Sequence, residues 1–250
     1  MTDVNPSDAS AATPRDAIIT AFMDLVGERG WDQASLADIA ERSGQGLGTI
    51  RAHFGSRMAI LEAYVAGIDR AVLDGIDADL ADQDTKERLF DVLMRRLDLL
   101  TPQKAAIRAL SKAAMRDPGL ALALNGLAVQ SQRWMLAAAG VDVNGAGGMI
   151  RAQGLAVAFA KVVQAWLDDE DPALARTMRV FDEQLAKARR AARTLNSVEQ
   201  LTRPLKSLLC APLSFGRRRR KDGWDEPRRP SEDGPGWRGD DFRDPRVTPV

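Results

Sequence analysis

Hydrophobic residues recur at intervals of three and four positions along most of the first 195 residues, which places them on one face of an α-helix. No stretch shows convincing strand alternation, so the pattern predicts an all-α fold. A capping side chain followed by proline or an acidic residue marks helix starts at Thr13, Ser35 and Asp117. The first helix begins at Pro14 and is predicted to end at Gly27 and Gly30. After residue 56 the predicted helices span about 57–80, 85–100, 102–115, 118–139, 146–168 and 172–195.

Residues 35–61 carry the most informative pattern. They predict a short helix, a glycine-rich turn, a second short helix and the start of a third. Two helices fixed at a steep angle by an apolar inner side, with a polar outer side, are what a helix-turn-helix requires. The expected inner residues are Leu36, Ile39 and Ala40 on the first helix, and Leu47, Ile50 and Phe54 on the second.

The second of these helices then turns a polar side outward, where a DNA major groove would meet it. Arginine there could hold a phosphate or reach a base edge. A glycine would let the backbone approach closely. The candidate DNA-binding residues are Gly46, Leu47, Gly48, Thr49, Arg51, His53 and Arg57.

The same segment resembles the TetR family of bacterial transcriptional regulators over roughly residues 14–65. The residues that match the family's pattern are Gly44, Gly48, Thr49, Ile50, His53, Phe54, Ser56, Arg57, Ile60 and Leu61. The resemblance implies an all-α, TetR-like homodimer, with an N-terminal three-helix helix-turn-helix domain followed by a C-terminal helical bundle. It also implies a palindromic double-stranded DNA operator and control by a small apolar effector.

The chain departs from the family's pattern at four places. Arg51 stands where the family has a phosphate-contacting tyrosine, and Gln45 replaces a small apolar residue of the turn. Gly46 replaces the usual Ser or Thr cap, which makes a looser helix start. Met58 replaces the usual acidic residue.

The pattern also divides the chain into parts. Residues 1–12 and 197–250 are predicted to be disordered, because they lack helical periodicity and offer too little apolar surface to offset their ordering entropy. The helix-turn-helix domain is expected over 13–60, and the ligand-binding and dimerisation domain over 61–196. The acidic run at 168–171 is interpreted as a solvated loop before a helix.

Large apolar side chains on the later helices allow two interpretations. One is a ligand cavity between helices, as the resemblance implies; the other is ordinary core packing. The helix predicted at 146–168 is rich in small residues and could form either a dimer interface or an intrachain contact. The candidate ligand-binding residues are Met115, Trp134, Met135, Phe159 and Trp166.

Composition narrows the possible functions. The 35 basic and 35 acidic residues cancel, and the segment 14–61 carries five arginines against six acids, which argues against a large nucleic-acid footprint. One cysteine and one histidine leave no Cys- or His-based metal site, and no catalytic constellation or cofactor motif is found. An enzyme is therefore not expected, and no cofactor or metal is predicted. Without a signal peptide or an apolar run of eighteen residues, a cytoplasmic protein is expected.

A second family offers an alternative. The stretches Glu87–Leu100 and Ala165–Leu185 look similar to the TetR-fold lipid-binding proteins of ubiquinone biosynthesis. Such a protein would hold an isoprenoid or another lipid in its helical cavity and bind no specific DNA. The altered turn at Gln45 and Gly46, together with Met58, fits this alternative better.

Overall fold

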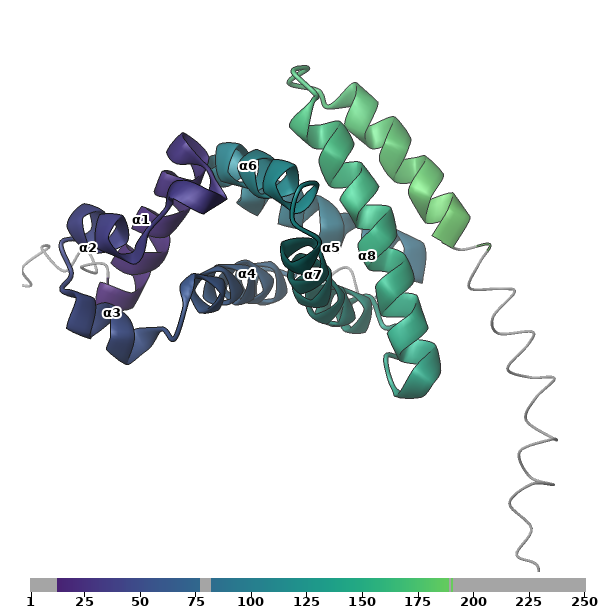
Figure 1. Ribbon diagram of the computed structural model, residues 1–250. Coiled ribbons are helices and arrows are strands. Elements are labelled where there is room, and N and C mark those ends of the chain that lie inside the picture. The colour runs from purple at the N-terminus through teal and green to yellow at the C-terminus, as the bar shows by residue number, and fades with distance from the viewer. Residues whose placement is uncertain (1–12, 77–81, 189, 191–250) are drawn as a thin grey trace, which may run out of the picture. The chain divides into compact units, whose positions relative to one another are not determined.

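The computed structural model describes residues 13–76, 82–188 and 190, and it contains no strand among them. The all-α prediction is confirmed (Figure 1). The predicted segments 1–12 and 197–250 lie outside the described residues. The helices are α1 (Pro14–Arg29), α2 (Leu36–Ser43), α3 (Leu47–His53), α4 (Arg57–Asp74), α5 (Thr85–Leu100), α6 (Lys104–Ala114), α7 (Pro118–Ala138), α8 (Gly145–Leu167) and a last helix over 175–188.

The predicted caps fix the helix starts. The Thr13 hydroxyl accepts a hydrogen bond from the Asp16 amide at 3.2 Å. Ser35 forms a reciprocal capping box with Asp38 at the start of α2, and one Asp117 carboxylate oxygen accepts from two amides of α7. These side chains satisfy amide groups that the first turn of a helix leaves without partners.

The end of α1 differs from the prediction. Gly27 lies inside the helix, and Gly30, with φ +89°, is the residue that ends it. Gly27 is instead the point where α1 approaches α6. A Cβ atom there would lie 3.2 Å from the Ala106 nitrogen and 3.4 Å from the Ala105 Cβ. Gly27 therefore allows α1 and α6 to pack closely. The sequence did not show this role, because the contact is with residues far away along the chain.

The predicted ends of two later helices also need correction. The helix α4 stops at Asp74 rather than near residue 80. The last helix starts at 175 rather than 172, because the residues before it form a turn in which Leu174 has φ +51°.

Asp169 organises that turn, and it is the one residue that departs from the interpretation of 168–171 as a solvated acidic loop, since Asp168, Glu170 and Asp171 are exposed. The side chain is buried, and its Oδ2 accepts hydrogen bonds from the Thr177 hydroxyl at 2.7 Å and the Thr177 amide at 2.8 Å. The hydroxyl and then the amide hold the pKa of Asp169 below its usual value. Since these bonds favour the ionised carboxylate, Asp169 ties the turn to the last helix above acidic pH.

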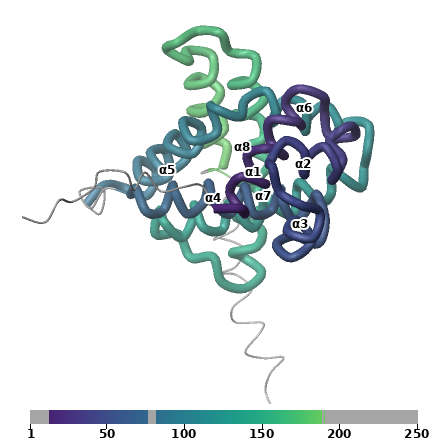
Figure 2. The backbone as a smooth tube through the Cα atoms, turned by 90° about the vertical axis from the view of Figure 1, so that its left-hand side faces the viewer, coloured from purple at the N-terminus to yellow at the C-terminus, as the bar shows by residue number. Residues whose placement is uncertain are grey.

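Two apolar cores stabilise the described residues. The first joins α1, α2, α3 and α4, and it also takes Ala106 and Leu110 from α6. The second joins α4, α5, α7, α8 and the last helix around Trp166 and Phe181. Figure 2 shows α6 beside the group formed by α1, α2 and α3. The helix α4 contributes to both cores and spans the predicted domain boundary at residue 60.

We predict that Gly27→Leu lowers the free energy of unfolding by about 1–3 kcal/mol, because the added side chain has to force α1 away from α6. Gly126→Leu in α7 is the matched control, since nothing lies within 4 Å of a Cβ built there. Urea unfolding of both variants measures the difference. Equal midpoints for the two would contradict the close contact at Gly27.

Candidate functional site

The turn between α2 and α3 is built from glycines. Gly44 adopts the left-handed conformation, with φ +67°, and its amide donates to carbonyls in the last turn of α2. Gly46 is the extended residue before α3, and its lack of a side chain leaves α3 without a side-chain cap. The helix α3 ends at His53, and the residue that caps it, Phe54, donates its amide to the Ile50 carbonyl at 2.8 Å. The result is two short helices with a tight turn between them.

The inner side of these helices is only partly as predicted. Ile39, Ile50 and Phe54 are buried. Leu36 is 40% exposed and Leu47 is 56% exposed, so the prediction that these two lie inward is wrong. Each is the first residue of its helix and therefore lies at a helix tip that the core does not cover.

The outer side of α3 presents most of the candidate DNA-binding residues to solvent. Thr49 is half-buried. Arg51 makes no hydrogen bond or ion pair with the described residues, so its guanidinium is free to bind an anion. The exposed candidates are Gly46, Leu47, Gly48, Arg51 and His53.

Arg57 is engaged inside the domain. Its Nη1 donates to the Trp31 carbonyl at 2.6 Å and to the Ala34 carbonyl at 3.1 Å. Its guanidinium carbon also lies 4.8 Å from the centre of the Trp31 ring. These contacts hold the loop between α1 and α2 against α4. The sequence analysis placed Arg57 among the DNA-binding candidates. Its backbone carbonyl partners could not be predicted, because such contacts leave no signal in a single sequence.

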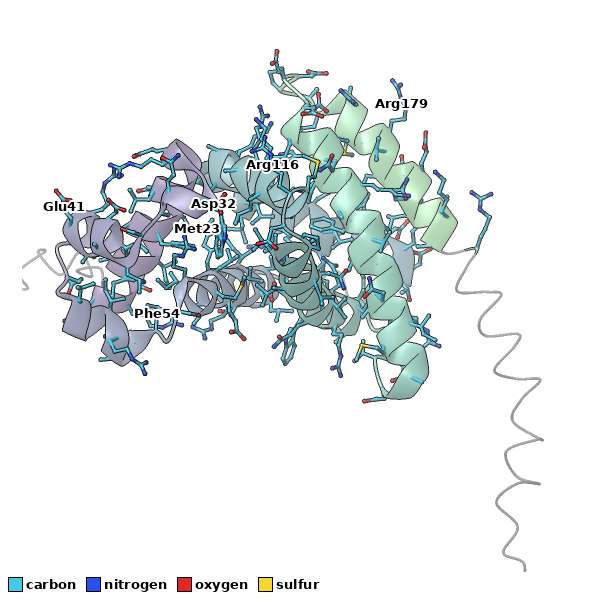
Figure 3. The ribbon with its side chains drawn as sticks, in the orientation of Figure 1. Met23, Asp32, Glu41, Phe54, Arg116 and Arg179 are labelled. Atoms are coloured by element: carbon cyan, nitrogen blue, oxygen red, sulfur yellow. The ribbon has the colours of Figure 1, made fainter. Side chains whose placement is uncertain are left out.

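Other cations of this domain are paired with acids. Arg42 binds Glu28 through two hydrogen bonds of 2.9 and 2.7 Å, which hold the pKa of Glu28 below its usual value. Arg29 lies 3.2 Å from Asp38. Another acid of the same helix, Glu41, points outward from α2 (Figure 3). The free positive charge of the helix-turn-helix is therefore small.

Sequence reasoning did not single out Arg15. Its guanidinium carbon lies 5.5 Å from the centre of the Phe54 ring, so a cation of α1 stands beside the end of α3. The only available signal was its presence in the first turn of α1, which does not reveal that Phe54 is its neighbour.

The candidate ligand-binding residues are not brought together. Met115 is 76% exposed at the end of α6. Met135, Phe159 and Trp166 are buried members of the second core, as the core-packing interpretation expects. Trp134 is 54% exposed and lines a cavity.

That cavity has a volume of about 320 Å³ and lies between α4 and α7. A polar group adjoins it: Asp69 of α4 is paired with Arg96 of α5, and its Oδ1 also accepts from the Ser131 hydroxyl of α7 at 2.7 Å. The hydroxyl of Tyr64 is also buried and finds no hydrogen-bond partner among the described residues, and burial raises the pKa of Tyr64 to about 12. The helices α4, α5 and α7 thus meet at a group of buried polar side chains.

A second groove, of about 600 Å³, is lined by the start of α5, by α8 and by the last helix. Its floor is apolar, with Leu89 and Leu155 among the lining residues, and lysines stand around it. In the parts of the chain that the structure describes, no three His, Cys, Asp or Glu side chains gather as a metal site would need. The same parts contain no helix long and apolar enough to cross a membrane.

Comparisons with known proteins agree with this arrangement. Residues 18–64 match the family model described as bacterial regulatory proteins, tetR family. The chain is 32% identical over 74 residues to the HTH-type transcriptional regulator AlkX of Mycobacterium tuberculosis, which covers 30% of this chain and 35% of that protein. It is 28% identical over 86 residues to the HTH-type transcriptional regulator YvdT of Bacillus subtilis, covering 34% of this chain and 44% of that one. The chain thus spans less than half the length of these curated relatives.

Solved structures extend the likeness over the fold. A TetR transcriptional regulator from Nitrosomonas europaea superposes with a TM-score of 0.56 at 22% identity, covering 70% of this chain and 97% of that one. A TetR-family regulator from Syntrophomonas wolfei gives 0.52 at 17% identity, covering 72% and 94%. At these identities the likeness concerns the fold alone, and it includes the helices after α4.

The geometry of α2, the turn and α3 is that of a helix-turn-helix. Residues 18–64, which contain this helix-turn-helix, match the tetR family model, and the described residues share the fold of solved TetR regulators. AlkX and YvdT are both named as regulators of transcription, so the lipid-binding alternative from ubiquinone biosynthesis is not favoured.

We predict that Arg57→Ala lowers the free energy of unfolding by about 1–3 kcal/mol, because two carbonyls lose the donor that satisfies them. Arg51→Ala, a few residues away and exposed, is the matched control and is expected to change stability by less than about 0.5 kcal/mol. Thermal or urea unfolding measures both. A stability loss at Arg51 as large as that at Arg57 would refute the assignment of Arg57 to packing.

Proposed function

We propose that this protein is a transcriptional regulator that binds a palindromic operator as a homodimer. The recognition helix is α3, and two copies would enter successive major grooves about 34–36 Å apart. The single observation that carries the proposal is the outer side of α3, where Gly48, Arg51 and His53 are exposed and Arg51 has no partner among the described residues.

Within α3 the residues have different proposed roles. Gly48 lets the backbone approach the DNA, and Thr49 contacts a phosphate or a thymine methyl group. Arg51 and His53 hold phosphates, and Arg15 adds a further cation beside Phe54. Arg57 is left out of this set because its guanidinium binds the Trp31 and Ala34 carbonyls.

The proposed dimer interface lies on α8 and the last helix. Met149, Ile150 and Val157 are each about half exposed on α8, and apolar side chains gathered on one exposed helix are typical of an interaction surface. Gly154 on the same face has open space around it, which would allow a partner helix to approach closely. Packing of these helices against their copies would give a four-helix interface.

Regulation by a small effector completes the proposal. An effector in the helical domain would change the spacing of the two α3 helices. It can shift this equilibrium only by its differential affinity for the two arrangements.

We predict that Arg51→Ala weakens binding to DNA from the protein's own upstream region by about 1–3 kcal/mol in the dimer. The slope of log affinity against log salt concentration should fall by about 2, because each of two protomers loses one phosphate contact. Fluorescence anisotropy with labelled duplex and unrelated competitor measures both quantities. Arg116→Ala, an exposed arginine that follows α6 and lies outside both the helix-turn-helix and the cavity between α4 and α7, is the control.

An unchanged affinity and slope in Arg51→Ala would remove Arg51 from the proposed contacts. Binding by the unsubstituted protein that is weak, salt-sensitive and indifferent to sequence would count against an operator-binding regulator altogether.

We predict that Val157→Glu converts the dimer to a monomer, because a carboxylate would be buried against the partner helix. Sedimentation velocity at several concentrations measures the oligomeric state. Gly126→Glu, at an exposed position of α7, should leave the dimer intact. A Val157→Glu protein that stays dimeric would place the interface elsewhere.

A further inference from the structure

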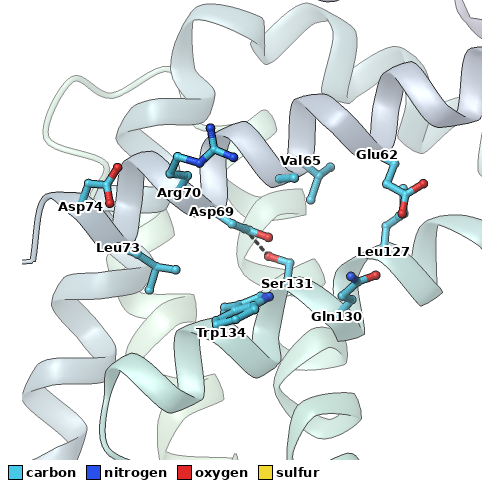
Figure 4. Close-up of a pocket in the computed structure, with 11 residues that line it drawn as sticks. Glu62, Val65, Asp69, Arg70, Leu73, Asp74, Leu127, Gln130, Ser131 and Trp134 are labelled. Carbon is cyan, nitrogen blue, oxygen red and sulfur yellow. Dashed lines mark hydrogen bonds between the residues drawn. The ribbon is translucent and has the colours of Figure 1, made fainter. Parts of the chain in front are cut away.

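The cavity between α4 and α7 has a mixed lining. Val65, Leu73 and Leu127 give it apolar walls, and Trp134 adds an aromatic ring that is 54% exposed. Figure 4 shows the hydrogen bond between Asp69 and Ser131 in the middle of this lining, with Trp134 beside it. With about 320 Å³, the cavity stands at the small end of the range for ligand pockets.

Asp69 offers this cavity an unused acceptor. The residue is only 8% exposed, and both of its hydrogen bonds, from Arg96 and from Ser131, end on Oδ1. Its Oδ2 receives no hydrogen bond from the described residues. Because Asp69 lines the cavity, this second carboxylate oxygen is available to a ligand that can donate a hydrogen bond to it.

Charge at the cavity favours a cation. Glu62 and Asp74 lie at the two ends of the cavity. With Asp69, they bring the number of carboxylates in the lining to three. Arg70 is the one cation in the lining. Arg96 lies outside the lining and forms an ion pair with Asp69. Counting these five groups leaves one net negative charge, in a hollow where low-dielectric walls strengthen the field.

An exposed tryptophan face beside carboxylates is a recognised setting for organic cations, because the ring quadrupole attracts positive charge. We propose that this cavity binds a small organic ammonium compound. The ammonium group donates to Asp69 Oδ2, and its apolar substituent packs on Trp134. Glu62 and Asp74 attract the cation from the rim.

The location also suggests what binding does. The helix α4 begins at Arg57, directly after the turn that follows α3, and the proposed ligand joins α4 to α7. A bound cation therefore fixes the position of α4 and favours one placement of α3. The proposed effect on α3 rests on the proposed DNA-binding function. The proposed cation site does not depend on that function.

The test is a titration of the full chain, labelled with ¹⁵N-tryptophan, with benzylammonium. The indole resonance of Trp134 is assigned among the five tryptophans from its loss in Trp134→Phe. This resonance is expected to shift and saturate. Benzyl alcohol, which has similar shape and no charge, is expected to bind about tenfold more weakly or worse, and benzoate is expected not to bind.

Variants at the rim separate charge from shape. The double variant Glu62→Gln, Asp74→Asn should weaken benzylammonium binding about fivefold or more, and Glu170→Gln, which removes an exposed acid outside the cavity, should not. Asp69→Asn is avoided because it leaves Arg96 buried without its partner. Equal binding of benzyl alcohol, no shift at Trp134, or equal loss in Glu170→Gln would each overturn the proposal.

Since the titration contains no DNA, its outcome is independent of the proposed function. A second measurement repeats the operator titration with saturating benzylammonium. If the protein binds the cation but no operator, the cation site is supported and the proposed DNA-binding function is refuted. If it binds operator but not the cation, the DNA-binding function is supported and the cation site is refuted.

Discussion

The close contact between α1 and α6 is the constraint on which the arrangement of the rest depends. Gly27 lets the two backbones approach until a Cβ atom would lie 3.2 Å from the Ala106 nitrogen. Ala106 and Leu110 then become part of the core that also holds α2 and α3. A helix from the later part of the chain thus completes the hydrophobic core of the helix-turn-helix domain. Without it, three short helices would have to bury their apolar faces with little area available.

A second, polar contact joins α4 to two other helices of the later part of the chain. Asp69, Arg96 and Ser131 bring α4, α5 and α7 to one point. Removing two charges from water costs several kcal/mol, and a buried pair recovers this only with good geometry and further hydrogen bonds. Such a pair is therefore better understood as fixing the register of three helices than as a large source of stability. Apolar packing alone would tolerate small sliding of α4 against its neighbours.

Local signals in the sequence predicted most of the helices, because caps and periodicity depend on residues a few positions apart. Thr13, Ser35 and Asp117 each act on amides within their own first turn. The glycine-rich turn before α3 was likewise recognisable. What the sequence could not give were features set by distant partners, such as Gly27 against α6 and Arg57 against the loop at Trp31. The same limit explains why Trp134, Met135 and Phe159 could not be sorted into cavity and core.

The paired charges on α1 and α2 have a consequence for how such a protein would search DNA. Arg42 and Arg29 are neutralised by Glu28 and Asp38, so little positive charge remains to hold the domain on any stretch of phosphates. Sequence-independent attraction is what lets proteins slide along a duplex between sites. A domain of this kind would spend short times on random DNA and find its target mainly through repeated encounters from solution. Its discrimination would then depend on the few side chains of α3 that reach the bases.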